Sequence, residues 1–80
     1  MIEYSRHARE RMDERGITEE QIALCLNNPD RKEPDDEPDR IRYLRCVPGH
    51  SVALRVVVRI EQRDFVITVL PDKRFRCPSA

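Results

Sequence analysis

The stretch Ser5-Arg-His-Ala-Arg-Glu-Arg-Met-Asp-Glu-Arg-Gly-Ile-Thr-Glu-Glu20 predicts two helices that are joined by a very short link. Ser5 can cap the first helix, expected over residues 5–15, and Gly16 can adopt the left-handed conformation that commonly follows a helix. The second helix is expected to begin at Thr18, because Thr18 and the three residues after it fit the capping-box pattern. The chain therefore opens with a helical hairpin.

Segments rich in β-branched and aromatic residues follow the helices and predict antiparallel strands. They cover residues 40–47, 52–60 and 65–70, and residues 2–4 could add a short fourth strand. Pro71 is expected to end the last strand. The prediction is a single α+β domain over residues 1–80, with the helix hairpin packed on one face of a three- to four-stranded antiparallel meander.

The short turns between these strands fix a register. The first turn pairs Tyr43 with Val56, and the second pairs Val58 with Ile67; a slip by one residue would turn a whole strand over. One face then gathers apolar side chains that should pack on the helices: Ile41, Tyr43, Leu54, Val56, Val58, Phe65, Ile67 and Val69. The other face carries Arg40, Arg42, Arg55 and Arg59, with Leu44, Val57, Val66, Thr68 and Leu70 between them. These arginines could bind an RNA backbone, or their stems could shield the apolar neighbours.

Two segments have compositions that argue against a packed core. Residues 29–39 hold three prolines and a dense run of charges, which predicts an acidic, solvated loop or an arm that shields the basic half of the chain. Residues 72–80 are expected to form a basic C-terminal tail. Although the net charge is zero, residues 40–80 carry nine Lys or Arg against three Asp or Glu, so the basic charge is concentrated in the second half.

The composition argues against a membrane-spanning, a secreted and a cofactor-dependent protein. The 80 residues contain no apolar run near the ~20 that a membrane span needs, and the N-terminus does not resemble a signal peptide, so a cytoplasmic location is expected. Cys25, Cys46 and Cys77 are widely spaced and odd in number, which predicts reduced thiols. No metal-ligand spacing and no glycine-rich phosphate loop is present, so neither a metal nor a cofactor is expected.

His7, Arg11 and Arg15 recur at four-residue intervals and would share one flank of the first helix. Metal-independent RNA cleavage needs a group that moves a proton near neutral pH and cations that stabilise the charged phosphorane. Histidine is the residue type for the first task and arginine for the second, while His50 is a weaker candidate. Each has a structural alternative: His7 could bond a backbone carbonyl, and the arginines could pair with nearby acids.

The same motif carries a resemblance to a known family. The relevant segments are His7-Ala8, Arg11-Met12, Arg15-Gly16-Ile17-Thr18, Asn28-Pro29 and Ile67-Thr68-Val69. They resemble the bacterial domain-of-unknown-function family DUF4258, over roughly residues 6–71. The resemblance implies a fold like that of the RelE/ParE-like and BrnT-like toxins, many of which cut messenger RNA and are held inactive by an antitoxin.

Two hypotheses from different classes follow. In the first, the protein is a toxin-like endoribonuclease, with His7, Arg11 and Arg15 in catalysis and Arg40, Arg42, Arg55 and Arg59 as nucleic-acid-binding residues. Its partners would then be RNA and an antitoxin protein. In the second, the protein is a non-catalytic interaction module whose mixed arginine and aliphatic sheet face binds a partner or forms a homodimer.

Overall fold

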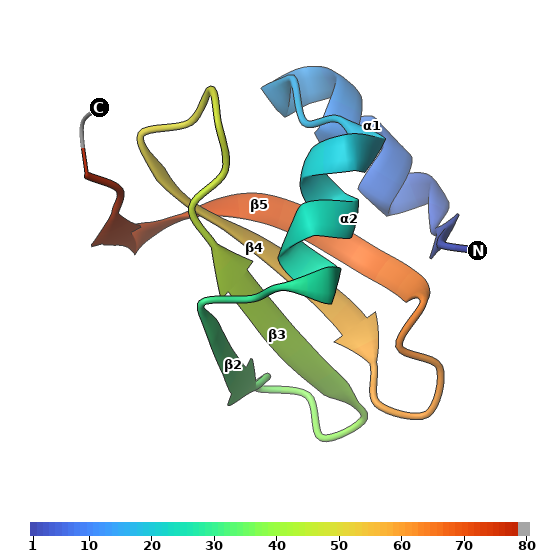
Figure 1. Cartoon of the computed structure of the whole chain (residues 1–80). Coiled ribbons are helices and arrows are strands. Elements are labelled where there is room, and N and C mark those ends of the chain that lie inside the picture. The colour runs from blue at the N-terminus through green and yellow to red at the C-terminus, as the bar shows by residue number, and fades with distance from the viewer. Residues whose placement is uncertain (79–80) are drawn as a thin grey trace.

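The computed structural model describes residues 1–78 and confirms an α+β fold. The elements in chain order are β1 (Glu3–Tyr4), α1 (Arg6–Arg15), α2 (Glu19–Asn27), β2 (Arg31–Pro34), β3 (Arg40–Arg45), β4 (Val52–Arg59) and β5 (Phe65–Arg76). The five strands form one sheet in the order β1-β5-β4-β3-β2, in which only the β1–β5 pair is parallel. Both helices lie on one side of it, α1 against β5 and α2 against β3 and β4 (Figure 1). Neither helix is long and apolar enough to cross a membrane.

The helical hairpin forms as its capping residues predict. The Ser5 hydroxyl accepts a hydrogen bond from the Ala8 N–H at 2.9 Å, and Gly16 ends α1 with a φ of 65°. In α2, the Thr18 hydroxyl accepts from the Gln21 N–H at 3.1 Å, and the Gln21 side chain accepts from the Thr18 N–H at 3.0 Å. These caps satisfy backbone donors that a helix start otherwise leaves unpaired.

A core forms between the helices and the near face of the sheet. Ala8, Ile22 and Cys25 from the helices are fully buried against Val56 and other strand residues. Burial of each large aliphatic side chain contributes about 1.5–3 kcal/mol of transfer free energy. Tyr43, predicted to face inward, is indeed in this core.

The predicted register holds between β3 and β4 and between β4 and β5 from Leu54 to Val57, but it fails at the start of β5. Tyr43 lies opposite Val56 as expected, whereas Val58 lies opposite Val66 and not opposite Ile67. A bulge at Ile67 causes the shift, because the extra residue moves Val66 onto the helix-facing side, where it is fully buried. The cap of α1 uses the irregular backbone: the Ser5 hydroxyl donates to the Ile67 carbonyl at 2.6 Å.

The prediction of a solvated loop over residues 29–39 is wrong for its first part. Residues 31–34 form β2, an edge strand that pairs with β3 and places Lys32 opposite Tyr43 and Glu33 opposite Arg42. The charged side chains do not prevent pairing, because an edge strand tolerates charge and proline where a central strand does not.

The prediction of a basic tail over residues 72–80 is also corrected. Strand β5 continues through Pro71 to Arg76, and residues 79–80 lie outside the described part of the chain. Pro71 does not stop the strand because β1 pairs only with Phe65 and Val66, so β5 has a free outer edge beyond them. A residue without an N–H is accommodated at such an edge.

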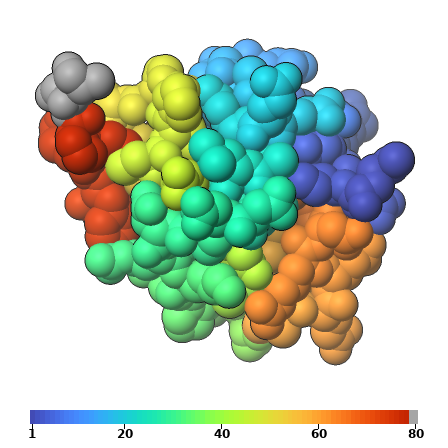
Figure 2. All heavy atoms as spheres, in the orientation of Figure 1, coloured from blue at the N-terminus to red at the C-terminus, as the bar shows by residue number. Residues whose placement is uncertain are grey.

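The prediction of three reduced thiols is wrong as well. Cys46 and Cys77 form a disulfide with a Cα–Cα distance of 5.7 Å. This bond joins the end of β5 to the start of the turn between β3 and β4. Figure 2 shows the two segments on one face of the molecule, the end of β5 in red and the turn in yellow. Cys25 alone is free, and burial raises the pKa of its thiol to about 12. The expected cytoplasmic location stays a prediction.

Candidate nucleic-acid interface

The flank of α1 and the helix-free face of the sheet enclose a surface hollow of about 470 Å³, here called the α1–sheet hollow. Its basic side chains are His7, Arg11, Arg15, Arg40 and Arg55, and its remaining lining residues are Asp35, Val57, Thr68 and Leu70. Strand β1 pairs only with Phe65 and Val66, so the rest of the outer edge of β5 has no partner strand. Helix α1 packs along β5, and its flank therefore reaches past this open edge to the helix-free face of the sheet. Cations from α1, β3 and β4 thus share one surface.

The three predicted α1 residues share this hollow but differ in their contacts. The Arg11 guanidinium binds the Glu14 carboxylate, with Nη1 at 2.6 Å from Oε1 and 2.7 Å from Oε2. His7 and Arg15 are exposed, and within residues 1–78 neither side chain has a hydrogen bond or an ion pair. The structural alternative predicted for Arg11 is therefore present, whereas the backbone bond considered for His7 is not observed there.

The predicted sheet arginines do not all reach the hollow. Arg40 and Arg55 line it, and Arg59 lies elsewhere, with its guanidinium stacked 4.3 Å from the centre of the Phe65 ring. Arg42 is enclosed by acids, with its Nε donating to Asp35 at 2.8 Å and further contacts to Glu33 and Asp36.

Acids from β2, from the residues just after it and from β5 neutralise part of the arginine face. Asp72, which is only 1% exposed, accepts hydrogen bonds from Arg55 and Arg74. Arg74 also donates to Glu33 at 2.6 Å, so the end of β5 and the edge strand β2 are bridged across this face. The result is an ion network of Asp36, Arg42, Asp35, Glu33, Arg74, Asp72 and Arg55.

This ion network lowers the pKa of three of its carboxyl groups. The hydrogen bond from Arg74, together with the nearby Arg55, holds the pKa of Asp72 well below its usual range. Hydrogen bonding by Arg74 likewise lowers the pKa of Glu33. Burial is the largest single influence on Asp35 and opposes its ionisation, but the hydrogen bond and charge of Arg42 together with backbone hydrogen bonds from Glu37 and Asp36 outweigh it, so the pKa of Asp35 is also lowered. All three carboxylates are therefore charged at neutral pH.

The network also covers the aliphatic side chains of the helix-free face. Leu44 is 2% exposed and Val57 is 3% exposed, although the sequence places both on a face that no helix covers. Leu44 lies opposite Arg55 and Val57 lies opposite Arg42, so the aliphatic stems of these arginines can cover both. The face is thus a charged surface over a buried apolar layer.

Sequence reasoning missed basic residues near the hollow. Lys73 and Arg76 were assigned to a tail, yet they lie on β5 and line a neighbouring hollow together with Arg15 and His50. A register shift separates Arg76 from Asp72 in the pairing with β4, so the end of β5 shows no regular alternation that could have indicated a strand past Pro71.

The comparisons with known proteins identify the family. The model of the family described as domain of unknown function (DUF4258) matches residues 4–71. The protein belongs to the DUF4258 family. No curated protein and no solved structure matches the chain. For this DUF4258 protein, the match covers α1 and the strands that form the α1–sheet hollow, and it ends just before Asp72.

Proposed function

We propose that this DUF4258 protein is a toxin-like RNA-binding protein that cleaves RNA without a metal ion, using the α1–sheet hollow. The observation that supports this most is the convergence of His7, Arg11 and Arg15 from α1 with Arg40 and Arg55 from the sheet. A phosphodiester is the ligand whose charge and geometry suit several guanidinium groups around one hollow.

The chemistry that these side chains can perform is internal transesterification of RNA. The ribose 2′-oxygen attacks the adjacent phosphorus, and the bond from phosphorus to the 5′-oxygen breaks. His7 takes the 2′-hydroxyl proton and returns it to the leaving 5′-oxygen, while Arg15 and Arg40 stabilise the charge on the phosphorane. The products are a 2′,3′-cyclic phosphate and a 5′-hydroxyl.

The arginines differ in how readily each can exchange its carboxylate partner for a phosphate. The Arg11–Glu14 pair is solvent-exposed, and such pairs contribute only about 0.2–1 kcal/mol, so a phosphate can replace Glu14. Arg55 is held by the buried Asp72, and Arg42 by three acids. We therefore expect Arg11, Arg15 and Arg40 to contact the phosphate, and Arg42 and Arg55 to support the surface.

The non-catalytic interaction module finds less support in the same contacts. That hypothesis needs an apolar centre on the sheet face, but Leu44 and Val57 are buried beneath the ion network. An interface with an apolar centre would bind with weak salt dependence, whereas an RNA surface loses affinity steeply as salt rises.

Growth of a bacterial host tests the proposal. Induced expression of the protein alone should arrest growth, and the His7→Ala variant should relieve the arrest at equal protein level. The Arg6→Ala variant serves as the matched control, because the Arg6 side chain is 95% exposed and does not line the hollow. Growth that is unaffected by the wild-type protein, or arrest that persists in His7→Ala, would contradict the toxin-like activity.

A further inference from the structure

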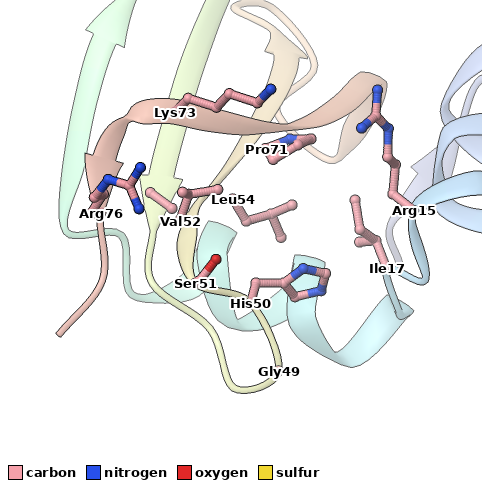
Figure 3. Close-up of a pocket in the computed structure, with 11 residues that line it drawn as sticks. Arg15, Ile17, Gly49, His50, Ser51, Val52, Leu54, Pro71, Lys73 and Arg76 are labelled. Carbon is pink, nitrogen blue, oxygen red and sulfur yellow. The ribbon is translucent and has the colours of Figure 1, made fainter. Parts of the chain in front are cut away.

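A second hollow of about 560 Å³ adjoins the first where α1 ends. Figure 3 shows the side chains of Arg15, His50, Lys73 and Arg76 arranged around it, and the Ser51 hydroxyl belongs to the same lining. We call it the hairpin hollow, because His50 and Ser51 belong to the turn between β3 and β4. Arg15 lines both hollows, so they form a continuous surface past the outer edge of β5.

The charges of the hairpin hollow are all of one sign. Its lining contains no carboxylate. Among the described residues, Arg15, Lys73 and Arg76 have no ion-pair partner, in contrast to Arg74 on the same strand, which is bound by Asp72 and Glu33. Unpaired cations keep their full attraction for an anionic ligand, because no local carboxylate must be displaced first.

The hollow is held by contacts that do not use its basic side chains. The Gln21 side chain donates to the Pro48 carbonyl at 2.8 Å, and the Cys77 N–H donates to the Ser51 carbonyl at 2.9 Å. The disulfide between Cys46 and Cys77 joins the same two segments. The turn and the end of β5 are thus fixed to each other, which positions donors before any ligand arrives.

The floor of the hollow is apolar. Ile17 and Leu54 are nearly fully buried beneath it, and Pro71 contributes to the same lining. A ring of donors around an apolar floor suits a ligand with a charged group and a flat or carbon-rich body. A nucleotide has this character, since its phosphate can meet the cations while its sugar or base covers the floor.

We propose that the hairpin hollow is a second phosphate subsite, which binds a flanking nucleotide of the RNA strand whose reacting phosphodiester occupies the α1–sheet hollow. This inference rests on the proposed function. Lys73 and Arg76 supply charge, His50 and Ser51 supply hydrogen-bond donors, and Arg15 lies between the two phosphates. An acidic protein segment is the competing occupant, and it would not require an RNA strand long enough to span both hollows.

The test is the dependence of binding on RNA length. Fluorescence anisotropy measures the affinity of wild type and of the double variant Lys73→Gln/Arg76→Gln for a dinucleotide and for a single strand of about ten nucleotides. The control is Lys32→Gln/Arg63→Gln, which removes the same charge from side chains outside both hollows. Circular dichroism verifies that each variant is folded.

We expect the Lys73→Gln/Arg76→Gln variant to lose roughly tenfold in affinity for the longer strand relative to the dinucleotide, and the slope of log affinity against log salt to become shallower by about 1.4. The control should keep the wild-type ratio. An unchanged ratio in the double variant, or an equal loss in the control, would overturn the second subsite while leaving RNA binding intact. Wild-type protein that binds neither RNA would instead overturn the proposed function.

Discussion

The carboxylate of Asp72 accepts two hydrogen bonds from the guanidinium of Arg55, at 3.2 Å from Nε and 3.1 Å from Nη2. Asp72 is 1% exposed, and it also binds Arg74, so one buried acid joins β4 to the end of β5. This contact is part of the ion network that neutralises Arg42 and Arg55 on the helix-free face. The cations that remain available to a ligand are therefore those around Arg15.

Replacement of Asp72 should destabilise the protein strongly. The Asp72→Asn variant keeps the size of the side chain but leaves Arg55 and Arg74 without their shared charge. We expect a loss of about 2 kcal/mol in the free energy of unfolding, since the partly exposed Arg55 and Arg74 lose hydrogen bonds to a charged acceptor. Thermal unfolding should show a midpoint lower by roughly 10 °C. A shift no larger than that of the exposed-site variant Asp13→Asn would contradict the structural role of Asp72.

Stability should fall in acid because the pKa of Asp72 is lowered by folding. A carboxyl whose folded pKa lies below its unfolded value stabilises the protein above the unfolded pKa and loses that contribution as the pH falls. Glu33 and Asp35 act in the same direction. Urea unfolding should therefore show a decline in stability from about pH 4 downward, the unfolded value of a carboxyl. Asp72→Asn should make this decline shallower, and an equally steep decline would count against the assignment.

Loss of the disulfide should also weaken the fold. Cys46 and Cys77 are 31 residues apart, so the bond lowers the chain entropy of the unfolded state and thereby stabilises the fold by about 3.7 kcal/mol. The Cys46→Ser/Cys77→Ser variant should unfold at correspondingly lower urea concentration, and a reducing agent should affect wild type but not the variant. Thiol titration of the denatured, unreduced wild type should find Cys25 alone. Three titratable thiols in the purified protein would show that the bond does not form.

The link between the helices offers a local test. Gly16 has a φ of 65°, and a Cβ placed there would meet nothing within 4 Å. The cost of Gly16→Ala is therefore conformational, about 1 kcal/mol for a left-handed residue, with no steric clash to add to it. Gly16→Asn should lose less, because asparagine tolerates this conformation better. Equal unfolding midpoints for all three proteins would contradict the cap geometry.

Local signals in the sequence predicted the helices and the central hairpin well. Ser5, Gly16 and Thr18 each determine a helix end through their own backbone and side chain, and the short turn before Val52 determines the β3–β4 register. The bulge at Ile67 has no such local signal. It depends on how α1 packs on β5, where the Ser5 hydroxyl at the start of α1 donates to the Ile67 carbonyl.

The candidate site was predicted only in part for a similar reason. The four-residue spacing of His7, Arg11 and Arg15 indicated their shared flank, which the hollow confirms. The pairing of Arg42 and Arg55 with acids could not be foreseen, since it requires β2 and the end of β5 to approach across two intervening strands. Long-range contacts of this kind leave no periodic trace in the chain.

The most direct measurement is the rate of RNA cleavage by the purified protein in the presence of a metal chelator, with wild type, His7→Ala and Arg6→Ala compared at equal concentration. The proposed mechanism predicts products that end in a 2′,3′-cyclic phosphate, a rate lower by about 10²–10⁴-fold in His7→Ala, and a wild-type rate in Arg6→Ala. RNA that stays intact with the wild-type protein, or cleavage that proceeds equally well without the His7 imidazole, would contradict it.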